Sequence, residues 1–248
     1  MSVYFWQLIV SAYLLGSVPA AYLAGKWSKG IDLRYRGSGN VGATNLLRFA
    51  SRRIAGPVIF FDFMKGGVMV WLARWLGFSL GSQMGVGIAA VCGHNWPLSL
   101  RFKGGRGIIT TSAVVFTAAR VNELVSVGTT ALIITGLNAV VWVNVLFKRG
   151  PLGVFIAIAA IPPLAWGLQA PLSFVQGCLG LFGVFVARRL TAPQPVKVES
   201  LTRRQVLINR LLFDRDIRDK ETWLSLLLRW EAKLRGVTDD EACHPPLC

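Results

Sequence analysis

Acidic residues are nearly missing from the first 190 positions of this 248-residue chain. Only Asp32, Asp62 and Glu123 occur there, and the other nine of the twelve acids follow. Charged residues make up 16% of the whole chain and hydrophobic residues 53%. Because an ordinary soluble domain carries about 25% charged residues, this composition excludes that class.

Long polar stretches are equally scarce, since apolar runs of nearly twenty residues recur up to position 190. Each such run is long enough to cross a bilayer as a helix. The sequence therefore predicts an all-α, polytopic membrane bundle of about seven spans. Gly16 and Pro19 predict a kink or a close helix contact within the first span. The spans are expected near residues 4–25, 54–76, 80–93, 108–119, 124–147, 151–168 and 171–187.

Two regions of different character divide the chain. Residues 1–190 form the transmembrane bundle, and residues 191–248 form a cytoplasmic or interfacial helical tail. The first run lacks the basic leader and the small-residue cleavage site of a signal peptide, so we expect it to remain as a span.

Basic residues are distributed very unevenly between the two sides of this predicted bundle. The connections at 26–53, 94–107 and 148–149, together with the chain after the last span, hold 24 of the 27 Lys and Arg. Without the tail the ratio is still 12 to 2. By the positive-inside rule the N-terminus lies outside and these connections and the C-terminus lie in the cytoplasm. This membrane explanation of the net charge of +15 leads us to expect no nucleic-acid partner.

The four cysteines do not form a disulfide framework. Cys92 and Cys178 sit in apolar runs and are most simply small buried hydrophobic residues. Cys243 and Cys248 flank His244, but a single pair with one histidine and two prolines between them is a weak metal motif. We therefore predict no metal site.

Several catalytic signatures are missing. A Walker A loop is absent, so nucleotide hydrolysis is not indicated, and there is no Gly-x-Ser-x-Gly elbow. His94 is the only histidine of the first 190 residues. Soluble-type glycerolipid acyltransferases carry an acid five residues after their histidine, and here that position is Ser99. An acyl transferase with this sequence would need a donor that is already activated.

Residues 37–48, reading Gly-Ser-Gly-Asn-Val-Gly-Ala-Thr-Asn-Leu-Leu-Arg, form a glycine-rich loop after the first span. Glycine reaches backbone conformations closed to other residues, so several N–H groups can point at one anion. A helix that starts nearby would also favour a phosphate. A tight turn that merely needs glycines explains this stretch equally well. The candidate phosphate ligands are Gly37, Ser38, Gly39, Asn40, Gly42, Thr44, Asn45 and Arg48.

Residues 94–112 contain a second loop of the same kind, between the third and fourth spans. Flexible backbone amides, cations and hydroxyls again stand at a predicted helix N-terminus. Positive-inside bias explains some of the cations. Two such loops on one side nevertheless indicate a site for two phosphates, or for one phosphate and a developing oxyanion. The candidates are His94, Lys103, Gly104, Gly105, Arg106, Gly107, Thr110, Thr111 and Ser112.

Asp62 and Lys65 stand three residues apart on the second span. A carboxylate at the centre of a membrane helix costs about 2.5–3.5 kcal/mol on insertion scales. The spacing places both side chains on one helix face, where they can pair. We favour a structural ion pair that braces the basic loops over direct catalysis.

The tail carries an amphipathic pattern over residues 221–235, with Trp223, Leu227, Trp230 and Leu234 at helical spacing. Residues 201–213 also predict a helix. The pattern favours a helix on the membrane surface, and packing against the cytoplasmic loops is the alternative.

At this point four segments together resemble a known family. They are Ser17-Val18-Pro19, residues 37–48, residues 61–66 and residues 93–107. In order and spacing they resemble the bacterial membrane acylphosphate:glycerol-3-phosphate acyltransferases, over about residues 5–190. The resemblance implies transfer of a fatty acyl group from acyl phosphate to the 1-hydroxyl of glycerol 3-phosphate, which gives lysophosphatidate and phosphate without a cofactor.

The same resemblance implies a place and partners. The protein would lie in the bacterial inner membrane, among membrane lipid, with its active site facing the cytoplasm. Contacts with other enzymes of phospholipid synthesis are a further expected partner class. Catalytic roles fall to Ser38, Arg48 and Lys103, and the second-loop glycines would bind the acyl phosphate. Arg106 stands where the family commonly has a second lysine.

One family motif is not kept. The family carries His-x-x-Asn-x-x-Arg-Leu just after the seventh span, whereas this chain has Arg188-Arg189-Leu190 and then a proline-containing linker. A later Arg204-x-x-Leu207-x-x-Arg210-Leu211 keeps only the end of the motif. Two alternatives stay open, and the missing motif favours the second of them. One is a transporter or flippase of phosphorylated metabolites, and the other is a noncatalytic homologue that scaffolds lipid enzymes.

Overall fold

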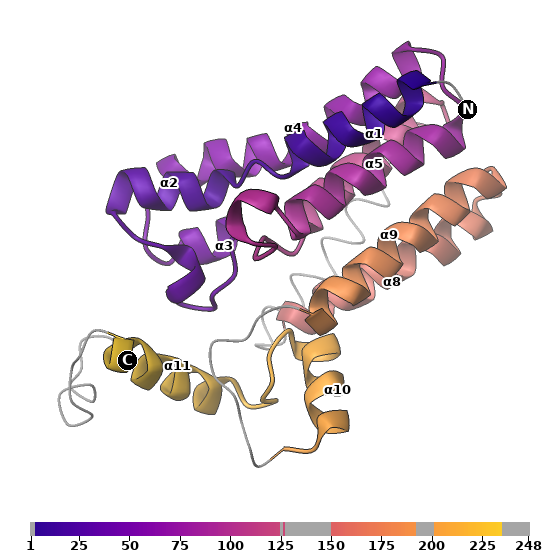
Figure 1. Ribbon diagram of the computed structural model, residues 1–248. Coiled ribbons are helices and arrows are strands. Elements are labelled where there is room, and N and C mark those ends of the chain that lie inside the picture. The colour runs from indigo at the N-terminus through magenta and orange to yellow at the C-terminus, as the bar shows by residue number, and fades with distance from the viewer. Residues whose placement is uncertain (1–2, 125, 127–149, 192–200, 235–248) are drawn as a thin grey trace.

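The structure is a computed structural model that describes residues 3–124, 126, 150–191 and 201–234. Within these ranges it is helical and contains no strand (Figure 1). The helices are α1 (Val3–Gly16), α2 (Ala20–Lys29), α3 (Ala43–Leu46), α4 (Arg52–Trp75), α5 (Leu80–Asn95), α6 (Ile108–Val121), α8 (Gly150–Gly167), α9 (Leu172–Thr191), α10 (Arg203–Phe213) and α11 (Lys220–Leu234), with 3-10 turns η1 (Leu33–Tyr35) and η2 (Leu98–Leu100).

Four stretches in the described part of the chain are long and apolar enough to cross a membrane. They are Val3–Lys29, which joins α1 and α2, and the helices α4, α8 and α9. α6 has 14 residues and spans about 21 Å, less than the roughly 30 Å hydrocarbon core. α5 has 16 residues. The fifth predicted span lies almost wholly outside the described residues, so the total of seven stays a prediction.

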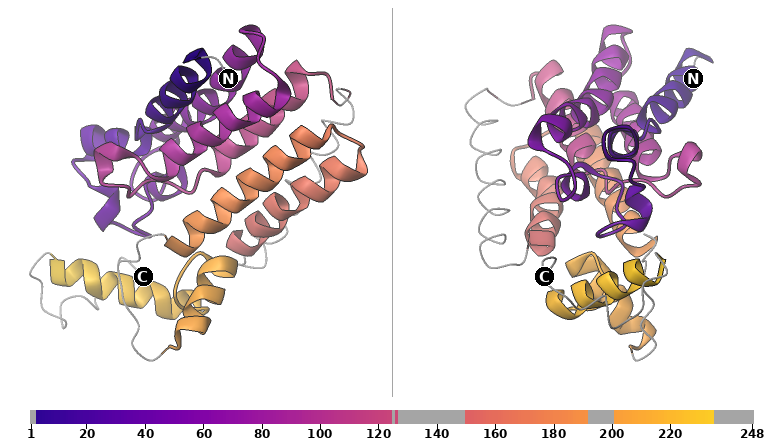
Figure 2. Two further views of the ribbon diagram at one scale, coloured as in Figure 1. Left: turned by 45° about the vertical axis from the view of Figure 1, so that its right-hand side comes forward. Right: turned by 90° about the vertical axis from the view of Figure 1, so that its left-hand side faces the viewer.

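The long helices run side by side and alternate in direction (Figures 1 and 2). α5 is central, because it packs against α1, α4, α6 and α9. A core of apolar side chains from α4, α5, α6 and α9 includes Val70, Met84, Val114 and Leu181, all at most 1% exposed. This alternation brings the end of α5, the start of α6 and the end of α9 to one end of the bundle, close to the tail (Figure 2).

The first predicted span is broken where Gly16 and Pro19 predicted a kink or close contact. α1 ends at Gly16 and α2 begins at Ala20, directly after Pro19. Close packing accompanies the break, because a Cβ atom on Gly16 would overlap the carbonyl oxygen of Ala90 in α5. The Tyr13 hydroxyl also donates a hydrogen bond to the Trp96 carbonyl at 2.7 Å. α1 and α5 therefore touch backbone to backbone just before the chain turns away.

The tail forms the two predicted helices. α10 begins with a capping box, in which Thr202 and Gln205 bond to each other's backbone N–H groups. On α11, Trp223 and Leu227 are buried, and the Trp230 ring stacks on Tyr35 of η1 with centroids 6.4 Å apart. α11 thus contacts the basic connection at 26–53, as the packing alternative expected. Its association with the membrane surface stays a prediction.

Gly16→Ala tests the close approach of α1 and α5. The added methyl group meets backbone rather than a flexible side chain, so the helices must separate. Overpacking of this kind costs about 1–3 kcal/mol, and we expect a lower thermal unfolding temperature in detergent. Gly183→Ala is the matched control, because nothing lies within 4 Å of its added Cβ atom. Equal unfolding temperatures for the two variants would contradict the close contact.

Candidate functional site

The two glycine-rich loops meet at one end of the bundle. Leu100 from the second loop packs in one apolar cluster with Leu33, Val41 and Leu46 from the first. A small pocket opens beside this cluster. Its lining combines the α1–α2 break, the first loop, α4 and the second loop, through Gly16, Ser17, Val18, Pro19, Ala20, Ala21, Val41, Asp62, Lys65, His94, Pro97, Gly104 and Gly105.

The first loop turns through left-handed backbone conformations at two of its three predicted glycines. Gly37 has a φ of 55° and Gly39 a φ of 67°, which L side chains rarely adopt. Gly42 is extended instead, with a φ of −148°, at the N-cap of the four-residue helix α3. The glycines at 37 and 39 therefore shape the loop, and the one at 42 does not need its conformational freedom.

Asn45 holds this loop together from inside. Its side chain is 2% exposed and accepts a hydrogen bond from the Ser38 N–H at 3.2 Å. The same amide donates to the carbonyls of Arg36 at 2.9 Å and Asn40 at 3.0 Å. Its hydrogen-bonding groups are therefore used on the loop backbone, so the phosphate contact expected of Asn45 has no free group here.

A cation just before the first loop, Arg34 of η1, is also paired with another residue. Arg34 contacts Asp32 through its Nη2 at 2.6 Å and lies over the rings of Tyr22 and Tyr35. Partial burial acts to raise the pKa of Asp32, but the hydrogen bonds and charge of Arg34 outweigh it and hold that pKa below its ordinary value. The charge of Arg34 is therefore used to hold this segment of the chain together.

The second loop folds back over His94. The Gly105 N–H donates to the His94 carbonyl at 3.1 Å. A Cβ atom on Gly105 would overlap the imidazole Nε2, and one on Gly104 would overlap the His94 carbonyl oxygen. Gly107, with a φ of 68°, then turns the chain into α6. Close packing thus requires glycine at positions 104 and 105. At position 107 the left-handed backbone conformation requires it.

Arg188, near the end of α9, fixes the position of this loop. Its Nε donates to the Gly105 carbonyl at 2.8 Å and its Nη2 to the Gly104 carbonyl at 2.6 Å. The residue is 2% exposed. Sequence reasoning counted Arg188 and Arg189 only as charges at the cytoplasmic end of the last span, and their burial and loop contacts were not foreseen. A pair of arginines directly at the end of an apolar run was the only signal available.

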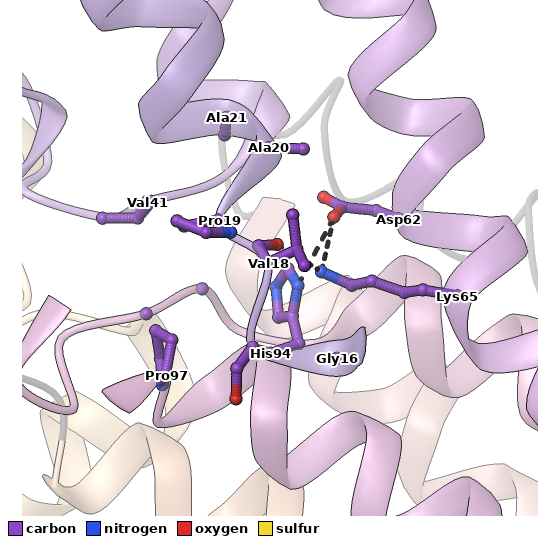
Figure 3. Close-up of a pocket in the computed structure, with 13 residues that line it drawn as sticks. Gly16, Val18, Pro19, Ala20, Ala21, Val41, Asp62, Lys65, His94 and Pro97 are labelled. Carbon is purple, nitrogen blue, oxygen red and sulfur yellow. Dashed lines mark hydrogen bonds and ion pairs between the residues drawn. The ribbon is translucent and has the colours of Figure 1, made fainter. Parts of the chain in front are cut away.

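Asp62, Lys65 and His94 form a buried polar cluster at the pocket (Figure 3). The Lys65 Nζ lies 2.8 Å from Asp62 Oδ1, and His94 Nδ1 lies 3.5 Å from the same oxygen. The Lys65 ammonium also reaches the Val18 carbonyl at the α1–α2 break, at 3.4 Å. His94 thus has an acid beside it after all, but the acid comes from α4 and not from position 99.

The remaining predicted residues lie in different places. Thr44, Arg48 and Lys103 are exposed and Ser38 and Asn40 half-buried, and none of these lines the pocket. The Thr110 hydroxyl donates to the Asp62 carbonyl at 2.9 Å and the Ser112 hydroxyl to Ile108 at 3.0 Å. The Thr110 hydroxyl therefore joins α6 to α4, whereas the exposed Ser112 hydroxyl bonds within its own helix. Thr111 is buried on α6.

Metal ligands do not gather in the part of the chain that the structure describes, where no three His, Cys, Asp or Glu residues form a group. Cys178 is buried, Cys92 is half-buried, and both are free thiols. Cys243, His244 and Cys248 lie outside the described residues. What the site does offer is backbone amides, cations and one histidine–carboxylate–lysine cluster, at the end of an apolar helical bundle. These features define an integral membrane protein with a polar cluster and two glycine-rich loops at one end of its bundle.

Comparison with known proteins narrows this class. The family model for glycerol-3-phosphate acyltransferase matches residues 6–192. Glycerol-3-phosphate acyltransferase 5 of Dehalococcoides mccartyi is 38% identical over 231 residues, covering 91% of this chain and 94% of that protein. A crystal structure of PlsY, an integral membrane glycerol 3-phosphate acyltransferase in its glycerol 3-phosphate form, matches with a TM-score of 0.65 at 27% identity. It covers 88% of this chain and 97% of that chain. The chain belongs to the glycerol-3-phosphate acyltransferase family.

Asp62→Asn tests whether the buried pair is structural. The change leaves the Lys65 ammonium, 2% exposed, without its ion-pair partner. Removing one member of a buried pair costs about 3–5 kcal/mol, so the thermal unfolding temperature in detergent should drop sharply. Adding Lys65→Met removes the unpaired charge and should restore most of that stability. A double variant no more stable than Asp62→Asn would show that the pair does not brace the fold.

Arg188→Met tests the clamp on the second loop. The variant keeps side-chain length but leaves two buried carbonyls without a donor. Hydrogen bonds to a charged group contribute about 1.5–3 kcal/mol each, so we expect lower stability and faster tryptic cleavage at Lys103. Arg188→Lys should lose about half as much, because an ammonium cannot span both carbonyls in the same way. Arg204→Met, at an exposed arginine, is the control. A lysine variant as stable as wild type would contradict the two-carbonyl contact.

Proposed function

We propose that this protein transfers a fatty acyl group from acyl phosphate to the 1-hydroxyl of glycerol 3-phosphate. The products are lysophosphatidate and inorganic phosphate. The observation that carries the proposal is the meeting of two glycine-rich, cation-bearing loops at one end of an apolar bundle, in a chain of this family. Two anionic reactants need such a place, where amides and cations converge beside lipid.

The chemistry suits residues that position and stabilise rather than attack. Acyl phosphate is a mixed anhydride with a good leaving group, so no covalent enzyme intermediate is needed. The glycerol hydroxyl oxygen bonds to the acyl carbon, the bond from that carbon to the phosphate oxygen breaks, and the phosphate leaves with the hydroxyl proton. Holding the two reactants together and stabilising the oxyanion are the main tasks of the protein.

The two loops divide these tasks. In this proposal Ser38 and Arg48 of the first loop bind glycerol 3-phosphate, which reaches the exposed Arg48 side chain from the aqueous side. The second loop binds the acyl phosphate through Lys103, Arg106 and the backbone amides of Gly104 and Gly107. Asp62 and Lys65 brace the α1–α2 break beneath both loops, since Lys65 contacts Asp62 and the Val18 carbonyl.

The proposed membrane placement follows the distribution of charge. The bundle has about seven spans in the bacterial inner membrane, with the N-terminus outside and both loops and the tail in the cytoplasm. The acyl chain lies between spans, and glycerol 3-phosphate arrives as a soluble substrate. Support comes from the 12 to 2 distribution of basic residues outside the tail.

The decisive experiment incubates purified protein with acyl phosphate and glycerol 3-phosphate and identifies the lipid by mass spectrometry. Acyl coenzyme A is tried in parallel as the donor. Lysophosphatidate from acyl phosphate supports the proposal, and product from acyl coenzyme A alone would overturn the donor assignment. Binding without turnover would indicate a noncatalytic scaffold. Uptake of glycerol 3-phosphate by proteoliposomes in the absence of product would indicate a transporter.

Ser38→Ala and Arg48→Ala are expected to lower the rate of lysophosphatidate formation by about 100-fold or more, the loss typical of removing one stabilising donor from a reaction centre. Both variants should still insert and elute as folded protein, because neither side chain is buried. Arg53→Ala, at an exposed arginine five positions further along, is the matched control. Rates close to wild type in both loop variants would remove this site assignment.

A further inference from the structure

The tail is tied to the bundle by a buried arginine. Arg189, 2% exposed, donates from Nη1 to the carbonyls of Leu211 and Leu212 at the end of α10, and from Nη2 to the Pro151 carbonyl at 2.7 Å. Its guanidinium lies over the ring of Phe185, 4.7 Å from the centroid. α9 therefore holds the second glycine-rich loop with one arginine and the tail with the next.

A second arginine, Arg210, also ties the tail to the end of α9, and it lies about one turn before the end of α10. Arg210 donates to the Leu190 carbonyl at 3.0 Å and pairs with Asp216, whose Oδ1 lies 2.5 Å from the Arg210 Nε. α10 ends at Phe213, between the contacts made by Arg189 and Arg210. The next residue, Asp214, takes a left-handed conformation with a φ of 57°. The chain around Asp214 is thus fixed on both sides.

Asp214 reaches from this anchored segment into the second loop. Its carboxylate oxygens lie 2.7 and 2.9 Å from the Arg106 Nε, although the two residues are 108 positions apart. Arg106 is 8% exposed and follows Gly105, whose carbonyl Arg188 holds. In the part of the chain that the structure describes, the two Nη groups of Arg106 have no hydrogen-bond partner.

We propose that Asp214 is a positioning residue that orients Arg106 toward the phosphate of the acyl donor. The inference rests on the proposed function and deepens it. A carboxylate at Nε fixes the plane of the guanidinium and leaves the Nη edge, which suits a phosphate oxygen. Asp214 acts through Arg106 and does not itself touch the donor. It lies beyond residue 192, where the family model ends, so the tail contributes to the site from outside that region.

A competing role for Asp214 would be to occupy Arg106 and keep the phosphate away. Two features favour positioning. The carboxylate takes only the Nε side of the guanidinium, and its backbone is held by the buried Arg189 and by Arg210 rather than left free to move. Preorganisation of this kind improves binding because the cation need not be ordered by the ligand.

The test compares Asp214→Asn with wild type in the binding of a fatty acyl phosphate without glycerol 3-phosphate, followed by kcat and KM for each substrate. Asn keeps the size of the side chain and tolerates the left-handed conformation, so the fold is preserved. We expect the Kd for acyl phosphate to rise about tenfold while the KM for glycerol 3-phosphate stays unchanged. Asp219→Asn, an exposed tail carboxylate that makes no contact with the loop, should match wild type.

A double-variant cycle separates positioning from a structural role. In an Arg106→Ala background, Asp214→Asn should have no further effect on the binding of acyl phosphate. If the two substitutions raise the Kd for acyl phosphate by independent factors that multiply in the double variant, the proposal is overturned. Tighter binding by Asp214→Asn would instead show that Asp214 competes with the phosphate for Arg106. The binding and turnover readouts are separable. Wild-type binding without lysophosphatidate formation overturns the proposed function alone, whereas absence of wild-type binding overturns both.

Discussion

The two hydrogen bonds from Arg188 to consecutive loop carbonyls decide where the second glycine-rich loop lies. They draw Gly104 and Gly105 against His94, whose own carbonyl then receives the Gly105 N–H. Once this segment is fixed, Arg106 and Gly107 follow at set positions and α6 can begin. A guanidinium suits this task because its planar fork reaches two acceptors at once, which a lysine ammonium does not do in the same fixed geometry.

Irregular backbone that is buried away from water must find its hydrogen bonds within the protein. The chain meets this need with polar side chains for which the sequence predicted three different roles: a substrate contact for Asn45, an end-of-span charge for Arg188 and a structural ion pair for Lys65. Asn45 bonds to the first loop, Arg188 to the second, and Lys65 reaches the break between α1 and α2. Buried polar residues therefore fix the backbone around the site.

The tail links the two loops to the end of the bundle. Asp214 contacts Arg106 in the second loop, and Trp230 stacks on Tyr35 beside the first. These contacts involve a region beyond residue 192, where the match to the family model ends. In this structure the two arginines join the loop and the tail to one helix end.

Sequence alone determined the class and the position of most helices, because an apolar run must be shielded from water and a helix satisfies its own backbone in lipid. α4, α8 and α9 begin and end within four residues of the predicted spans. The spacing of Asp62 and Lys65 was also enough to predict their ion pair, since residues three apart on a helix share a face. Tertiary structure decided the rest. His94 beside Asp62, Arg188 on the loop carbonyls, and Asp214 on Arg106 join segments far apart in the chain, and only the packing of helices sets such distances.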